Sequence, residues 1–473
     1  MAYYAKTYKF REEFMLRTNK ISRNTLFLLI FCSFFVTCFG LISVRAEAGI
    51  IRDTEIEFRL RQLSLPLAQQ AGFADGVHFT IVADPAFNAF VAGRDRIYIH
   101  TGLLLNAETD GEILGVIAHE IGHLSAGHVP RRDQAIANAN LATALTTLAA
   151  IATTATGDTD AAAGIIIGGT DRARRTYLAS SRVDEAVADE WALMAMDNAG
   201  FSSEGLSKLM RRLSRQRALP QDRQSEYYST HPNPELRLSA IEDHVQESAV
   251  TGTPIPETIK THLWRIRAKL SGYNNTPLTR ALQTQIDQAE TAAEDDILTA
   301  MAYREAIRSY RRGSLDKARL QIDALLTDHA NDPFFHELAG EIAFASGDID
   351  AAAEAYRKAL TLFPNAPQIA LSLGRVLVAK GTPSHLDEAV QMLERAVKGE
   401  PNWAFARREL GIAYGRSGRL AHAHLSLAEE ALLRGALQDA INLSERALRV
   451  EAVPNDVEAR ARDILFHLSQ PLQ

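Results

Sequence analysis

One stretch decides how this chain is interpreted: Val116-Ile117-Ala118-His119-Glu120-Ile121-Gly122-His123. It carries the pattern H-E-x-x-H inside residues 110–128, where apolar residues recur at helical spacing. Because four residues make about one helical turn, His119 and His123 share a face and can bind one Zn²⁺ ion together. Glu120 lies beside them, where it can take a proton from water activated by the metal. The pattern therefore predicts a hydrolytic zinc site on a helix.

A hydrolytic zinc site needs a third protein ligand, and the best candidate lies about 60 residues further on. The segment 181–189, S-R-V-D-E-A-V-A-D, places Glu185 and Asp189 on one face of a second predicted helix. Glu185 is predicted to bind the zinc ion, and Asp189 to accept a hydrogen bond from a ligand histidine. His128 follows His123 by five residues, which excludes the metzincin motif. We therefore expect His128 to point away from the ligand face and to be structural.

The composition of the 473-residue chain excludes several classes of protein. Its 51 Lys and Arg residues against 58 Asp and Glu residues give a net charge of −7, so no overall basic field favours nucleic acid. Only two cysteines are present, Cys32 and Cys38, which excludes a disulfide scaffold and a cysteine-rich metal cluster. The length favours two or three domains.

The N-terminal segment has the three parts of a secretory signal peptide. An uncharged apolar run at residues 25–44 follows a basic segment and precedes Ala46-Glu47-Ala48, a small-x-small cleavage pattern. We predict a signal peptide at residues 1–48, cleaved after Ala48, which places the mature chain in the periplasm. Because about 20 apolar residues can also span a bilayer, an uncleaved inner-membrane anchor is the alternative. Met15 is an alternative start.

Cleavage would change both the cysteine count and the charge of the chain. Both cysteines lie within residues 1–48, together with seven basic and three acidic side chains. The mature chain would then contain no cysteine and carry a net charge of −11. Any metal site in it must use nitrogen and oxygen ligands.

The rest of the chain divides into two zones. Residues 49–250 are mixed in pattern and form the predicted metallopeptidase domain, with strands expected at 77–83, 89–92 and 97–100. Residues 251–256, T-G-T-P-I-P, are rich in helix breakers and mark the predicted boundary. Residues 257–470 are Ala-, Leu-, Arg- and Glu-rich, which predicts a helical second domain.

The helical zone repeats with a period of 34 residues. Gly313, Gly347 and Gly381 are 34 residues apart, and Gly418 follows after 37 because Thr382-Pro383-Ser384 looks inserted in a turn. Each glycine precedes a small residue in the next predicted helix: Ala318, Ala352, Ala389 and Ala423. This period with small residues at the helix contacts is typical of tetratricopeptide repeats. Helices expected at 257–271 and 278–298 would join or cap the array.

These motifs resemble those of the HtpX/CAAX-prenyl-protease family of zinc metallopeptidases. The resemblance rests on H-E-I-G-H at 119–123 and on S-R-x-x-E-x-x-A-D at 181–189. Upstream, residues 88–90, 97–99 and 101–104 fit the strand that precedes the zinc helix in that family. With a signal peptide and C-terminal repeats, the chain is similar to the group of periplasmic β-barrel assembly-enhancing proteases.

The resemblance implies the fold and the zinc ligands. The fold would be an α+β zincin-like metalloprotease domain, mostly helical with a small sheet, followed by an all-α tetratricopeptide repeat solenoid. One Zn²⁺ ion per chain would be held by His119, His123 and Glu185, with Glu120 as the catalytic carboxylate.

The same resemblance draws attention to the segment Thr230-His231-Pro232-Asn233-Pro234. His231 could stabilise the tetrahedral intermediate, or it could occupy the open zinc position as a latch. A surface histidine in a proline-stiffened turn is the third alternative. Arg237 could support the site together with Asp189, or it could simply pair with a carboxylate.

The function that the resemblance implies is hydrolysis of misfolded or stalled outer-membrane proteins. An extended substrate would add to an edge strand containing residues 88–91 through backbone pairing. The repeats would contact the outer-membrane β-barrel assembly machinery or its substrates. The alternative function is a repeat-based chaperone or adaptor for outer-membrane protein assembly, in which the protease activity is latent.

One further segment remains open to two interpretations. Residues 134–170 are rich in Ala, Thr, Leu and Ile and end in G-I-I-I-G-G at 164–169. They could form a buried helical hairpin. They could also form a mobile apolar flap that covers the cleft, contacts a membrane surface or touches an unfolded client.

Overall fold

The computed structural model describes a large part of the chain in several ranges: 49–128, 182–218, 225, 227, 230–231, 234–292 and 294–469. The predicted signal peptide with both cysteines lies outside the described residues, and so does the apolar segment 134–170. Within the described ranges, no helix combines the length and the apolar character needed to cross a membrane.

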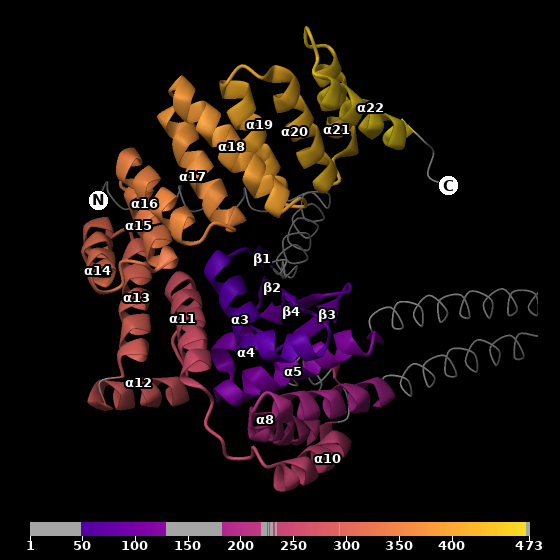
Figure 1. Cartoon of the computed structure of the whole chain (residues 1–473), viewed down its shortest axis with the longest axis vertical. Coiled ribbons are helices and arrows are strands. Elements are labelled where there is room, and N and C mark those ends of the chain that lie inside the picture. The colour runs from indigo at the N-terminus through magenta and orange to yellow at the C-terminus, as the bar shows by residue number, and fades with distance from the viewer. Residues whose placement is uncertain are drawn as a thin grey trace, which may run out of the picture. The chain divides into compact units, whose positions relative to one another are not determined.

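A small sheet of four strands lies near the start of the described chain (Figure 1). Its strand order is β1-β2-β4-β3, so β3 is an edge strand. β4 pairs with β2 in parallel and with β3 in antiparallel register, with Phe90 opposite Tyr98. The three strands expected from the sequence are confirmed within one residue at each end. The strands are β1 (Gly49–Ile51), β2 (His78–Ala83), β3 (Ala89–Ala92) and β4 (Arg96–His100).

Helix α5 (Asp110–Ser125) is buried along nearly its whole length and carries the H-E-x-x-H pattern. It begins at Thr109, whose side chain accepts a hydrogen bond from the backbone N–H of Glu112. It packs against β3 on one side and against α8 on another, and Figure 1 shows it between the sheet and α8. The remaining helices of this half are α3 (Thr54–Gln70), α4 (Thr101–Asn106), a helix at 182–198, α8 (Glu204–Ser214), the 3₁₀ turn η1 (Arg215–Ala218) and α10 (Pro234–Glu247).

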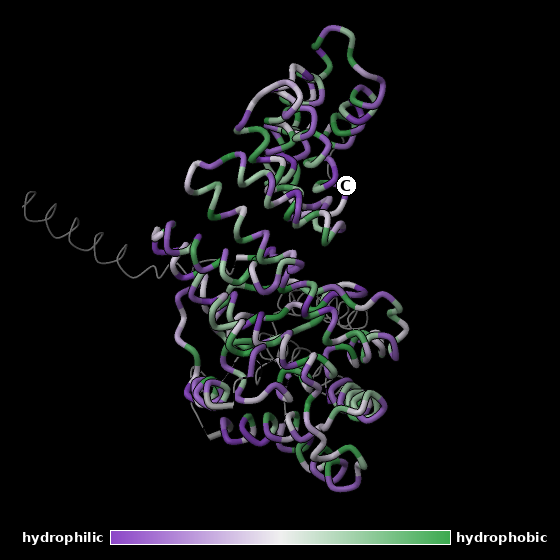
Figure 2. Tube along the Cα trace, turned by 60° about the vertical axis from the view of Figure 1, so that its left-hand side comes forward, coloured by the Kyte–Doolittle hydropathy of each residue, from purple (hydrophilic) through white to green (hydrophobic). Residues whose placement is uncertain are grey.

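Five helix pairs follow in the C-terminal part that the structure describes. Gly313, Gly347, Gly381 and Gly418 each end the first helix of a pair with φ between 71° and 80°, a conformation that favours glycine. Hydrophilic and hydrophobic residues alternate along these helices (Figure 2), as expected for helices that bury one face. The pairs are α13 (Asp295–Arg311) with α14 (Leu315–Asp328), α15 (Pro333–Ala345) with α16 (Ile349–Leu362), α17 (Pro367–Lys380) with α18 (Pro383–Gly399), α19 (Ala404–Arg416) with α20 (Leu420–Leu433), and α21 (Leu437–Leu448) with α22 (Asn455–Ser469).

The predicted fold class is confirmed, with differences in detail. The insertion predicted in the turn near Thr382 lengthens a helix instead. α18 begins at Pro383 and has 17 residues, whereas the equivalent helix α16 has 14. Proline is accommodated in the first turn of a helix, where its missing N–H needs no partner. The helix expected at 278–298 is two helices, since α12 (Arg280–Ala292) ends before α13 begins at Asp295.

Helix α11 (Glu257–Asn274) packs against both halves of the described chain. Leu263, Ile266 and Leu270 belong to the core that also contains residues of α3 and α5. Trp264 and Ala268 belong instead to a cluster with α12 and α13. α11 therefore has no solvated face over much of its length, and it also buries charged groups.

A buried network of charged groups surrounds Glu55, which is fully buried on α3. Its Oε1 lies 2.7 Å from an Arg265 nitrogen, and its Oε2 lies 3.5 Å from Lys269 Nζ and accepts a hydrogen bond from Tyr303 Oη at 3.0 Å. Lys269 Nζ also lies 3.3 Å from Glu337 on α15. Burial alone would raise the pKa of Glu55, but the three surrounding cations lower it to about 2. The network stabilises contacts between α3, α11 and the first repeats.

Replacing Glu55 by glutamine is expected to lower the free energy of unfolding at pH 7 by about 3 kcal/mol, since it removes a buried anion that pairs with Arg59, Arg265 and Lys269. The pKa of Glu55 is lower in the folded chain, so its contribution is complete above about pH 4.5 and is lost as the pH falls toward 2. The unfolding midpoint in urea, measured from pH 7 to pH 3, should therefore fall less steeply for the variant than for the wild type. If the urea midpoint fell equally steeply with pH in both proteins, this account would be contradicted.

Candidate metal centre

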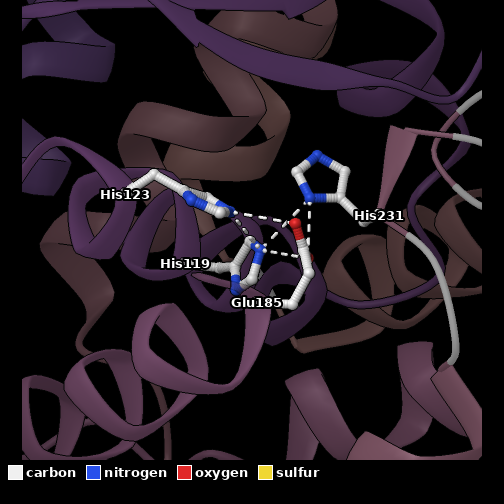
Figure 3. Close-up of side chains that lie close together, drawn as sticks. All are labelled: His119, His123, Glu185 and His231. Carbon is white, nitrogen blue, oxygen red and sulfur yellow. Dashed lines mark hydrogen bonds and ion pairs between the residues drawn. The ribbon is translucent and has the colours of Figure 1, made fainter. Parts of the chain in front are cut away.

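The two histidines of the motif lie one turn apart on α5, and their rings meet. His119 is fully buried and His123 is 4% exposed. Their Nε2 atoms are 3.1 Å apart, and Figure 3 shows both rings pointing toward the carboxylate of Glu185. The helical spacing therefore does bring the two nitrogen atoms to one point in space.

Glu185 on helix 182–198 lies against both histidines. Its Oε2 is 3.3 Å from His119 Nε2, and its Oε1 is 3.4 Å from His123 Nε2. The two helices approach closely because α5 has glycine at 122. A Cβ atom at Gly122 would lie 2.7 Å from the carbonyl oxygen of Ala188. This contact is what allows the carboxylate to reach the histidines.

Asp189, one turn after Glu185, lies against the opposite ring nitrogen of His119. The distance from Asp189 Oδ1 to His119 Nδ1 is 2.9 Å. Arg237 on α10 donates to Asp189 Oδ1 and Oδ2 at 2.7 and 2.6 Å, and to Glu185 Oε2 at 2.9 Å. Arg237 is buried and so bridges both carboxylates of the helix. Arg237 therefore pairs with carboxylates and supports the site at the same time, because those carboxylates lie against the two histidines.

His231 is 3% exposed, so it is not a surface histidine. Its Nδ1 lies 3.2 Å from His119 Nε2 and 3.1 Å from Glu185 Oε2, and its Nε2 lies 3.4 Å from Glu120 Oε1. The ring of Tyr227 stacks on it with the centroids 4.3 Å apart. The ring of His231 thus contacts the predicted metal ligands His119 and Glu185 through Nδ1 (Figure 3) and the predicted catalytic carboxylate through Nε2.

The electrostatics of the cluster differ between its members. Burial lowers the pKa of His123 to about 3, so its ring is neutral at pH 7. Burial also acts to lower the pKa of His119, but the carboxylates of Asp189 and Glu185 outweigh it and raise the pKa to about 9. Burial would raise the pKa of Glu185, yet the surrounding histidines hold it well below its usual range. A metal ion therefore competes with a proton for His119 and meets an ionised carboxylate.

The donor atoms fit a zinc ion. In a tetrahedral site with bonds of about 2.0–2.1 Å, the ligand atoms lie about 3.3–3.4 Å from one another. The two Nε2 atoms are 3.1 Å apart, and Glu185 has one oxygen 3.3 Å from Nε2 of His119 and the other 3.4 Å from Nε2 of His123. With His231 included, all four donor atoms lie within 4.8 Å of one another. Two imidazoles and a carboxylate are also the ligand set of hydrolytic zinc sites.

His128 differs from the expectation that it points away from the ligand face. Its Nδ1 lies 2.8 Å from Nδ1 of His123, and its Nε2 lies 3.5 Å from Oδ1 of Asp184. Spacing along an ideal helix missed this contact because α5 ends at Ser125. Gly127, with φ of 64°, then turns the chain back toward His123. A glycine directly before the histidine was the signal in the sequence.

A cavity of about 290 Å³ opens beside the cluster. Residues 90–93, from edge strand β3 and the turn that follows it, line one side. The lining on the other sides comprises Glu120, His123, His128, Asp184, Thr230 and His231. The cavity therefore places a strand edge next to the candidate metal centre.

Two parts of the chain are similar to known protein families. Residues 56–245 match the model described as peptidase family M48, and residues 303–367 and 343–408 match two tetratricopeptide repeat models. The "Beta-barrel assembly-enhancing protease" of Yersinia pestis is 23% identical over 410 residues, which cover 86% of this chain and 82% of that protein. "Metalloprotease LoiP" of Escherichia coli (strain K12) is 26% identical over 181 residues, which cover 37% of this chain and 65% of that protein.

One of the similar solved structures is "MamA 41-end from Desulfovibrio magneticus RS-1". It has a TM-score of 0.29 and 22% identity, and the match covers 36% of this chain and 92% of that chain. The family matches agree with the buried cluster on α5 and with the helix pairs that follow it. The chain therefore carries a metalloprotease domain of peptidase family M48, followed by tetratricopeptide repeats.

Proposed function

We propose that this chain is a zinc endopeptidase that hydrolyses extended segments of misfolded or stalled outer-membrane proteins in the periplasm. The observation that carries the proposal is the buried convergence of His119, His123 and Glu185 beside a cavity that is also lined by an edge strand. The name of the relative from Yersinia pestis supports the substrate class, and the signal peptide predicted at residues 1–48 supports the location.

The proposed zinc ligands are Nε2 of His119, Nε2 of His123 and the carboxylate of Glu185. When bound, a zinc ion supplies a Lewis acid that polarises the scissile carbonyl and makes water more acidic. Glu120 is buried next to His119 and lines the same cavity. It accepts a proton from the attacking water and then gives it to the leaving nitrogen. Asp189 and Arg237 hold His119 and Glu185 in orientation.

The proposed substrate site is the free edge of β3, since an extended peptide can add to a strand edge through backbone hydrogen bonds. Residues 90–93 lie at this edge and line the cavity together with Glu120. Backbone pairing selects unfolded or extended segments and places few demands on their sequence. This selectivity suits a protease that removes proteins which have failed to fold.

His231 is proposed to act as a latch. Its Nδ1 lies 3.1 Å from Glu185 Oε2, as close as Nε2 of His119 at 3.3 Å, in the place of a fourth donor. A hydrolytic site needs that position open for water and substrate. His231 must therefore move away before an extended peptide can be cleaved.

Replacing His231 by alanine tests the protease and the latch together. The purified mature variant is expected to cleave an unfolded protein at least about 10-fold faster than the wild type, and removal of zinc by a chelator should abolish this cleavage. Gel analysis of a denatured substrate over time measures both. An inactive variant beside an active wild type would show instead that His231 stabilises the transition state. If neither protein shows cleavage that a chelator abolishes, the proposed protease function is contradicted.

The second candidate function is a repeat-based adaptor for outer-membrane protein assembly with latent protease activity. The position of His231 among the ligand atoms and the five helix pairs favour it. Within both proposals, residues 49–250 form the peptidase domain and residues 257–470 the repeat domain, which would bind the β-barrel assembly machinery or its substrates. Residues 134–170, which lie outside the described residues, are proposed to contact client or membrane.

A further inference from the structure

The ligand histidine His123 has a second partner, on the ring nitrogen that does not face Glu185. While its Nε2 lies near Glu185, its Nδ1 lies 2.8 Å from Nδ1 of His128. His128 is 4% exposed, and the two rings are inclined by 69° with their centroids 5.0 Å apart. On its far side, Nε2 of His128 lies 3.5 Å from Oδ1 of Asp184. Three polar side chains thus form a line that ends on a carboxylate.

The chemistry of a neutral imidazole gives this line one direction. A ring that offers Nε2 to a metal carries its proton on Nδ1, so His123 Nδ1 must donate. His128 Nδ1 then accepts, which leaves the proton of His128 on Nε2, facing Asp184. An ionised carboxylate only accepts, so Asp184 suits the end of the line. Each member therefore fixes the tautomer of the one before it.

The other ligand histidine has an equivalent partner. His119 Nδ1 lies 2.9 Å from Asp189, whereas His123 reaches Asp184 only through His128. Both aspartates and the proposed ligand Glu185 lie on helix 182–198. Asp184, the residue before Glu185, and Asp189, one turn after it, thus serve the two histidines. His128 connects His123 to Asp184.

We propose that His128 is a positioning residue for the metal site: it accepts the Nδ1 proton of His123, is itself oriented by Asp184, and so holds His123 in the tautomer and ring orientation that bind zinc. This inference rests on the proposed function, since it takes His123 as a zinc ligand. His128 does not bind the metal. Partners of this kind change metal affinity by about 10–100-fold when they are removed.

Asparagine and leucine at position 128 separate hydrogen bonding from shape. The two side chains have the same branched skeleton, and only asparagine places an acceptor where His128 has Nδ1. The mature full-length chain is stripped of metal, and its affinity for Zn²⁺ is measured by competition with a chromophoric chelator. His128→Leu is expected to weaken zinc binding about 10–100-fold, and His128→Asn by less than about 3-fold.

The matched control is a histidine that contacts helix 182–198 near its C-terminal end. His244→Leu removes a histidine that pairs with another aspartate of the same helix, Asp197, at 3.0 Å, and should leave zinc affinity unchanged. Wild-type affinity in His128→Leu would overturn the inference, and so would equal weakening in His128→Leu and His128→Asn. No zinc binding by the wild type would instead overturn the proposed function itself.

A second pair of variants covers the case in which His128→Leu does not fold. Asp184→Leu removes the acceptor at the end of the line, whereas Asp184→Asn keeps an oxygen there. Asp184→Leu is then expected to weaken zinc binding at least about 3-fold relative to Asp184→Asn. Equal affinities for these two variants would overturn the inference.

Discussion

Replacing Glu120 by glutamine is expected to lower kcat for cleavage of an unfolded protein by about 10³-fold while the chain keeps its zinc. Glutamine has the same shape but cannot accept the proton of the attacking water. Glu120 is fully buried and is not one of the proposed zinc ligands, so the metal content should not change. The measurements are the cleavage rate in the His231→Ala background and the zinc content of the same samples.

Glu190→Gln is the matched control, because Glu190 is an exposed carboxylate of helix 182–198. It should cleave at the rate of its parent. A Glu120→Gln chain that keeps more than about a tenth of the parent rate would contradict its role as the general base. The same variant separates the two candidate functions in the cell, since the adaptor function should survive the substitution and the protease function should not.

Replacing Gly122 by alanine is expected to have a second large effect, on the metal site as a whole. The added Cβ would lie 2.7 Å from the carbonyl oxygen of Ala188 and 3.1 Å from its Cα. These are backbone atoms, so helix 182–198 must move away from α5. Glu185 then moves with the helix, away from the two histidines. Zinc affinity should fall at least about 10-fold, measured by chelator competition as for His128.

Gly415 provides the control for this substitution. It is also a helical glycine, on α19, but a Cβ there would lie 3.8 Å from its nearest neighbour, Ala423 Cβ. Gly415→Ala should therefore leave zinc affinity unchanged and stabilise the chain by up to about 1 kcal/mol. If Gly122→Ala bound zinc as the wild type does, the close approach of the two helices would not be what positions Glu185.

Much of the site was predictable because its residues follow local periodicity. His119 and His123 share a face of one helix, and Glu185 and Asp189 share a face of another, as spacings of four require. The 34-residue period of glycines predicted the helix pairs for the same reason, since each repeat is a local unit. The catalytic roles of these residues stay predictions until they are tested.

The position of His128 and the partners of Glu55 could not be predicted, because they depend on contacts that the spacing of residues does not encode. The position of His128 follows from where α5 ends and from the positive φ of Gly127, not from helical periodicity. The polar partners of Glu55 meet it only in the folded chain, because Tyr303, which donates a hydrogen bond to it, lies 248 residues away in the sequence. Periodicity predicts which face of a helix is apolar, but it does not show which buried charges will become partners.

Metal analysis of the purified mature chain tests the central claim most directly. Elemental analysis of the wild type and of Glu120→Gln should find about one zinc ion per chain in both proteins, with cleavage of an unfolded protein lost only in the variant. Loss of that zinc in a Glu185→Leu variant would locate it at the cluster on α5 and helix 182–198. A wild-type chain that binds no zinc, or that cleaves equally well without it, would contradict the account.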